Sequence, residues 1–201
     1  MVPPVVEVAS SHATATAIDT SVIGMPARAK SAKPSRTPAA AARSTGIAVF
    51  YAQADHRPDY RDFAPHIADL GYTGKPGEPP RRMGPPPVVG GTPGAEVIDE
   101  IAPQPADYMI KKHRWSTFFQ THFELSLRTA GIDTLLLAGG AVEVGIASTA
   151  YAARDMDFNQ IILRDACSTS RAEVNEIFMN QVFPIFARVM TVDQAIALIN
   201  A

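Results

Sequence analysis

Short apolar runs alternate along this chain with segments in which apolar residues recur at helical spacing. Continuous apolar runs of this length predict buried strands, and the segments between them predict amphipathic helices. The expected strands cover residues 47–53, 107–112, 133–138, 158–165 and 187–190. The expected helices cover residues 37–46, 121–131, 142–155, 170–180 and 191–201. Strands that alternate with helices in this way predict an α/β fold around a parallel sheet.

Capping residues mark the ends of three of these helices. Thr37 is placed to cap the first of them, with Pro38 at its first position and Gly46 just past its end. Gly131 closes the second helix, and Thr191 caps the last one.

The first strand of the sheet is the element that the pattern leaves open. Residues 13–19 alternate, but they are rich in Ala, which is a poor strand former. Residues 4–8 are a better strand by composition. Both segments therefore remain candidates.

A long segment rich in Pro and Gly follows the strand at residues 47–53 and extends over residues 58–93. So many prolines exclude regular structure there. Long loops in compact domains are usually functional lids or contacts, so we expect a lid or a contact between subunits.

Composition and charge exclude several classes of protein. The chain has 201 residues, 46% of them hydrophobic and 19% charged, which is typical of a folded globular domain. Its net charge of -2 argues against nucleic acid or an anionic membrane as a partner. No apolar run reaches the length of a membrane span, and the first residues lack the pattern of a secretory signal. We therefore expect a cytoplasmic protein with no membrane partner.

The basic residues gather in one part of the chain. No acidic residue lies between Asp19 and Asp55, while this stretch contains Arg28, Lys30, Lys33, Arg36 and Arg43. An acid-poor, Arg- and Ser-rich segment is typical of an organelle transit peptide. A mobile, solvated loop has the same composition, and we favour that interpretation.

Ligands of parallel α/β sheets bind at the carboxyl ends of the strands. In this chain that edge carries Lys112, residues 139–145 and the end of the first strand. We therefore expect the ligand-binding site at this edge of the sheet.

Three stretches together resemble the isochorismatase-like hydrolase family, often called cysteine hydrolases. They are residues 91–107, residues 110–140 and the glycine-rich turn, helix and strand of residues 139–169. The middle stretch carries the family's pattern at Lys112, Arg114, Trp115, Ser116 and Phe118. The resemblance implies a three-layer αβα fold with a central, mostly parallel sheet, in one domain over residues 1–201. Residues 1–36 match the family poorly, and we expect this segment to be partly mobile.

The family's usual chemistry uses an Asp, a Lys and a nucleophilic Cys. The Lys lowers the thiol pKa, the thiolate attacks an amide carbonyl and the Asp shuttles the proton. The resemblance assigns the lysine to Lys112 and the cysteine position to Gly145, so the catalytic cysteine is missing. The single cysteine, Cys167, is expected to be a buried structural residue. Hydrolysis through a thiol is therefore excluded.

Some members of the family also lack the cysteine. As the resemblance implies, their Asp protonates a vinyl ether and water attacks the resulting cation, which requires a protonated carboxyl group but no protein nucleophile. In this chain Asp19 is the best candidate for the acid. If residues 4–8 form the first strand, Glu7 or no acid at all lies at the edge.

Five further residues are candidates for substrate contacts: Arg114, Trp115, Phe118, Val142 and Glu143. Arg114 could bind a substrate carboxylate or pair with an acidic neighbour. Glu143 is either a replacement for the catalytic acid or a solvated residue in the first turn of the helix. Asp55 and His56 resemble part of the metal site of nicotinamidase-type relatives, but further ligands are lacking. We therefore expect no metal and no cofactor.

Two functions from different classes follow from these residues. The first is a hydrolase of a small, anionic metabolite that uses Asp19 and Lys112 in acid–base chemistry. The second is a catalytically silent relative that binds a partner or forms oligomers. The resemblance implies a homo-oligomer in either case.

Overall fold

The computed structural model describes residues 13–19, 37–59, 61–62, 88–169 and 171–200, and for residues 13–19 and Glu100 it describes the backbone alone. Its strands are β1 (Ala13–Asp19), β2 (Ala48–Ala54), β3 (Tyr108–Lys112), β4 (Ile132–Gly140), β5 (Asn159–Ser168) and β6 (Arg188–Met190). Its α-helices are α1 (Pro38–Ser44), α2 (Phe123–Thr129), α3 (Ala147–Asp155), α4 (Ala172–Ile177) and α5 (Val192–Ile199). Short 3-10 and π-helical turns are η4 (Asp99–Ile101), η5 (Val142–Ile146), η6 (Phe178–Val182) and η7 (Phe183–Ile185).

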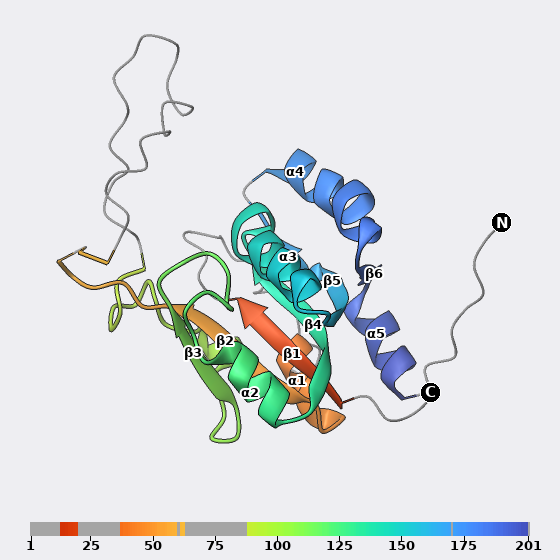
Figure 1. Cartoon of the computed structure of the whole chain (residues 1–201), viewed down its shortest axis with the longest axis horizontal. Coiled ribbons are helices and arrows are strands. Elements are labelled where there is room, and N and C mark those ends of the chain that lie inside the picture. Colours follow the sequence, from red (N-terminus) through yellow and green to blue (C-terminus); the bar gives the residue numbers. More distant parts are fainter. Residues whose placement is uncertain (1–12, 20–36, 60, 63–87, 170, 201) are drawn as a thin grey trace, which may run out of the picture.

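The six described strands form one parallel sheet in the order β3-β2-β1-β4-β5-β6. Helices cover both of its faces (Figure 1). Along β4, Leu135 and Leu137 pack in the cluster that contains residues of α2 and α3. Leu136 and Ala138 point the other way, into the cluster that contains residues of α1 and α5. The expected three-layer αβα fold is confirmed.

Residues 13–19 form the first strand of the sheet. β1 pairs with β2 on one side and with β4 on the other, so it lies in the interior of the sheet. The backbone hydrogen bonds of two neighbours compensate for the weak strand preference of its alanines. The alternative strand at residues 4–8, with Glu7, lies outside the described residues.

The helix ends expected from capping residues are confirmed. The side chain of Thr37 accepts a hydrogen bond from the backbone of Ala40 at 3.2 Å. Thr191 and Gln194 cap each other at the start of α5. Gly46 and Gly131 adopt φ angles of 74° and 68°, which favour glycine because it lacks a Cβ.

Most expected elements lie within two residues of the observed ones at each end, and three differ by more. The helix expected over residues 142–155 begins as the π-helical turn η5, and its α-helical part starts at Ala147. The helix expected over residues 170–180 is α-helical only over α4 and continues as η6 and η7. The strand expected to end at Asp165 continues to Ser168, because β5 pairs again with β4 after a shift in register.

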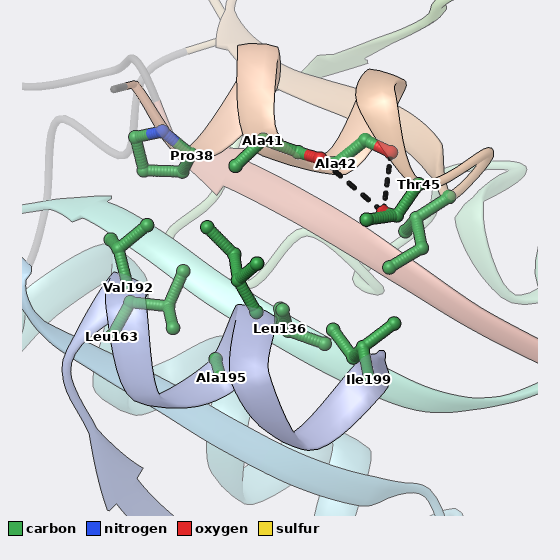
Figure 2. A pocket seen from close by; sticks show the side chains of 11 residues that line it. Pro38, Ala41, Ala42, Thr45, Leu136, Leu163, Val192, Ala195 and Ile199 are labelled. Carbon is green, nitrogen blue, oxygen red and sulfur yellow. Dashed lines mark hydrogen bonds between the residues drawn. The ribbon is translucent and has the colours of Figure 1, made fainter. Parts of the chain in front are cut away.

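A small apolar pocket lies where α1 and α5 face each other over β4 and β5 (Figure 2). Its lining is Pro38, Ala41, Ala42, Thr45, Ile47, Leu136, Leu163, Val192, Ala195, Ile196 and Ile199. The only polar side chain among them, that of Thr45, donates its hydroxyl to helix carbonyls of α1. The pocket offers no group for catalysis.

Most of the Pro-rich segment, residues 63–87, lies outside the described residues, as do the basic residues Arg28 to Arg36. Val89 forms an isolated parallel bridge with His56, so the chain returns from this segment beside the end of β2. Among the described residues, no helix is long and apolar enough to cross a membrane.

Candidate functional site

The carboxyl ends of four adjacent strands bring the expected acid and lysine to one edge of the sheet. Asp19, the last residue of β1, is in register with Ala52 of β2 and with Gly139 of β4. Lys112, the last residue of β3, is in register with Ala54 of β2. Both positions therefore lie at the carboxyl edge, two strands apart, and Asp19 is next to the end of β4, where the following turn begins. The structure describes Asp19 by its backbone alone.

The side chain of Lys112 points into the protein, and that of its neighbour Lys111 points to the surface. Lys112 is 2% exposed, and its amine donates to the carbonyl oxygen of Trp115 at 2.9 Å and to that of Arg114 at 3.4 Å. Lys111 lies 3.4 Å from the Asp55 carboxylate on the surface. Successive side chains of a strand point to opposite faces, which explains why only one of the two lysines is buried. Lys112 thus fixes the backbone of the loop that follows β3.

The turn after β4 contains Gly145, the residue to which the resemblance assigns the cysteine position. β4 ends at Gly140, a cis peptide bond joins Gly140 to Ala141, and η5 then leads into α3. Gly145 is buried in this turn. Residues 140–146 contain no Cys, Ser, Thr or Lys.

Glu143 is the ionisable residue of this turn. Its Oε1 accepts a hydrogen bond from the Thr169 hydroxyl, at the end of β5, at 2.8 Å. Its Oε2 is buried and has no hydrogen-bond partner among the described residues. An unsatisfied carboxylate oxygen is costly to bury, so this atom is suited to accept a hydrogen bond from a bound ligand.

The other four expected substrate contacts fall into two groups. Phe118 and Val142 are 7% and 0% exposed and belong to the main hydrophobic core, because both side chains point at apolar neighbours instead of the edge. Arg114 donates to the backbone oxygen of Asp62 at 2.9 Å. Trp115 is 63% exposed beside the Lys112 loop. Only Arg114 and Trp115 remain at the surface near the edge.

Cys167 lies near the carboxyl edge of the sheet, on the side of β4 opposite Asp19. It is in β5, in register with Gly139, and its Sγ lies 3.7 Å from the carbonyl oxygen of Leu137. Its side chain packs against the main core. Cys167 is partly buried and not fully buried as expected, and its structural role stays a prediction.

A second cluster of ionisable groups lies next to Lys112, and the sequence did not predict it. The Asp62 carboxylate is 3.5 Å from Nδ1 of His56 and 3.6 Å from Nε2 of His113. It also accepts hydrogen bonds from the backbone N–H of Arg57. His113 directly follows Lys112 in the sequence, but nothing local indicates that Asp62 meets it. Among the described residues, no group of three side chains is arranged to hold a metal ion.

The stability of the protein is expected to depend on pH through His56. Burial lowers the pKa of His56 below its usual value, although the Asp62 carboxylate opposes this shift and His113 adds to it. The unfolded chain then binds a proton more readily than the folded one. The stabilising contribution of neutral His56 is therefore complete above the unfolded pKa of about 6.5 and is lost as the pH falls through the lower folded pKa.

Denaturant unfolding at pH 5, 6 and 7 measures this effect. The wild type is expected to lose more free energy of unfolding between pH 7 and pH 5 than the variant His56→Gln, which cannot titrate. Parallel losses in the two proteins would show that His56 is not the group responsible.

Comparison with known proteins agrees with this architecture. The isochorismatase domain model matches residues 15–194. An uncharacterised isochorismatase family protein of Bacillus subtilis is 38% identical over 100 residues, which cover 50% of this chain and 53% of that protein. The chain thus spans about half the length of the curated relatives it matches.

Two solved structures are similar over most of their length. One is an isochorismatase family protein from Desulfovibrio vulgaris, which is 26% identical with a TM-score of 0.73, over 95% of this chain and 100% of that one. The other is N-carbamoylsarcosine amidase from Thermoplasma acidophilum, which is 26% identical with a TM-score of 0.66, over 90% and 97%. The match to the domain model covers most of the sequence, and the chain belongs to the isochorismatase family.

Proposed function

We propose that this protein is a hydrolase of a small metabolite that works without a cysteine nucleophile. Asp19 and Lys112 are its acid–base pair. The observation that carries this proposal is the register of the sheet, which brings the ends of β1 and β3 to the same edge on the two sides of β2.

In this mechanism the carboxyl group of Asp19 donates a proton to a labile ether, enamine or similar bond. Water adds to the cation that forms and returns one proton to Asp19. The tetrahedral adduct then breaks its bond to the leaving oxygen or nitrogen, which takes up the proton of the adduct's hydroxyl group, and the carbonyl product is released. The ammonium group of Lys112 orients the carboxyl group or stabilises charge on a substrate oxygen. No covalent intermediate with the protein is required.

Gly145 supports a mechanism of this kind. The resemblance to the family assigns the cysteine position to this glycine, and we propose that the chain represents a branch in which that nucleophile is absent. We propose that Cys167, which is partly buried and packs against the core, does not replace the missing thiol.

We propose that Glu143, Arg114 and Trp115 contact the substrate. The buried Oε2 of Glu143 suits an N–H or O–H donor of the ligand, and the exposed ring of Trp115 offers an apolar surface. The guanidinium group of Arg114 suits an anionic group. Phe118 and Val142 are not part of this proposal, because they belong to the core.

We also propose that the protein is a cytoplasmic homo-oligomer in which the chain forms one domain. The large apolar side chains of Ile177 and Ile185, which are 48% and 80% exposed, support an assembly that covers them. Light scattering of the purified chain measures its mass in solution, and a monomer would contradict the assembly.

The hydrolase proposal predicts turnover that does not depend on a thiol. The purified protein is screened against vinyl ethers, enamines and amides, and amides are included because the similar Thermoplasma protein is an amidase. Any hydrolysis is expected to survive iodoacetamide and the substitution Cys167→Ser, and to be lost in Asp19→Asn. Hydrolysis that disappears with Cys167→Ser would contradict the mechanism. The absence of turnover across the panel would favour a catalytically silent binding protein.

A further inference from the structure

A buried pair of threonine hydroxyls joins the two sides of the candidate site. Thr117 lies in the loop after β3, and Thr149 lies in α3. They are 2% and 3% exposed. Oγ1 of Thr149 accepts a hydrogen bond from the backbone N–H of Thr117 at 3.0 Å, and the two hydroxyl oxygens are 3.2 Å apart. Hydrogen bonds that are buried in this way fix backbone positions closely, because water cannot replace them.

The loop that Thr149 holds is the loop that holds Lys112. The carbonyl groups of Arg114 and Trp115, which accept from the Lys112 amine, lie three and two residues before Thr117. On the other side of Thr117, the ring of Phe118 packs 4.8 Å from that of Phe123. The loop is therefore anchored at Thr117 and Phe118, and two of its carbonyl groups, those of Arg114 and Trp115, meet at the Lys112 amine.

Thr149 also lies one helical turn after Gly145. Residues i and i+4 of a helix share one face, so the hydroxyl of Thr149 is on the side of α3 that continues from the glycine turn. The hydrogen bonds of Thr149 thus connect the turn that carries Gly145 with the loop that carries the partners of Lys112.

We propose that Thr149 is a positioning residue, whose buried hydroxyl acts through Thr117 to fix the loop carbonyls that hold the Lys112 amine. The relevance of this role to catalysis rests on the proposed function, in which Lys112 takes part in the chemistry. The structural part of the proposal does not depend on any activity.

The reactivity of the Lys112 amine tests this proposal without a substrate. The native protein is treated briefly with an acetylating reagent, and the modification of each lysine is measured by peptide mass spectrometry. The exposed neighbour Lys111 serves as the internal reference within the same peptide. In the wild type, Lys112 is expected to react far more slowly than Lys111. Thr149→Val keeps the shape but removes the hydroxyl, and loss of one hydrogen bond of about 1 kcal/mol predicts a rise of about fivefold in the relative rate of Lys112.

Two controls separate positioning from general loss of stability. Thr149→Ser keeps a hydroxyl at the same position and is expected to restore the low relative rate. Leu127→Ala removes a fully buried side chain of α2 that has no part in the hydrogen bonds of the loop, so it destabilises the protein without freeing Lys112.

An unchanged relative rate in Thr149→Val would overturn the proposal, and so would an equal rise in Leu127→Ala. Either outcome leaves the hydrolase proposal standing, because that proposal is tested by turnover. Conversely, a fivefold rise in a protein that hydrolyses nothing confirms the positioning role and contradicts only the catalytic one.

Discussion

Replacing Lys112 with methionine is expected to lower kcat/KM by about 10²–10³-fold on any substrate found in the screen. Methionine has a similar length but removes the positive charge and its hydrogen bonds. The charge lies at the edge of the sheet where β1 and β3 both end. Charge that develops on the substrate in the transition state would then have no compensating group there. Steady-state kinetics of the two proteins measures the loss.

Lys111→Met is the matched control for this experiment. Lys111 adjoins Lys112 in β3, but it faces outward and lies beside Asp55 on the surface. Its replacement is expected to leave kcat/KM near the wild-type value. A similar loss of kcat/KM in both variants would show that the effect comes from the total positive charge at this edge and not from Lys112 itself. Full activity in Lys112→Met would contradict the acid–base mechanism. Thermal unfolding of Lys112→Met checks that the loop of Arg114 and Trp115 tolerates the loss of its hydrogen-bond donor.

The largest effect on stability is expected for Phe123→Ala, which should lower the free energy of unfolding by about 3–5 kcal/mol. Phe123 is fully buried where α2 packs on the sheet. Its ring lies 5.4 Å from that of Phe50 in β2 and 4.8 Å from that of Phe118 in the Lys112 loop. Alanine loses both aromatic contacts and leaves a cavity among side chains that cannot close over it. Denaturant unfolding measures the change.

Leu125→Ala on the same helix is the control. Leu125 is 69% exposed, so its truncation creates no cavity and is expected to cost about 0.5 kcal/mol or less. If Phe123→Ala cost as little as Leu125→Ala, the packing of α2 on the sheet described here would be wrong. Because Phe123 supports Phe118, we also expect the variant to loosen the loop that holds Lys112.

Local signals in the sequence predicted the helix ends because each signal acts within a few residues. Thr37 and Thr191 bond to backbone groups three residues along the chain, and Gly46 and Gly131 adopt the left-handed backbone that other residues avoid. The apolar run of β4 predicted a strand buried on both faces for the same reason, since its pattern is contained within the strand itself.

Local signals were not sufficient to identify the first strand. The alanines of residues 13–19 have little strand preference, so the pattern left residues 4–8 as an alternative. In the structure, residues 13–19 pair with β2 and β4 at once, and both partners lie far away in the sequence. No property of the segment by itself predicts that two neighbours will flank it.

Only part of the candidate site was predicted, because some of its contacts join segments that are distant along the chain. Strand order and chain direction brought Lys112 to the carboxyl edge as expected, and alternation within β3 explains why it and not Lys111 is buried. Phe118 and Val142 were expected at the substrate and lie in the core, because their direction depends on how the loop and the turn pack. Asp62, His113 and the pair of Thr117 and Thr149 were not predicted, since their partners come from separate elements.

The sequence by itself determined the α/β class, the family, the helix caps, the absence of a cysteine from the turn at Gly145, and the place of Lys112 at the carboxyl edge of the sheet. Each of these depends on residue types and short spacings, which are properties of the sequence and do not require the folded structure. Only the tertiary structure decided which segment is the first strand, which aromatic side chains fill the core, and which groups hold Lys112 in place. Those contacts join residues that are distant along the chain, and they form only when strand pairing and helix packing bring them together.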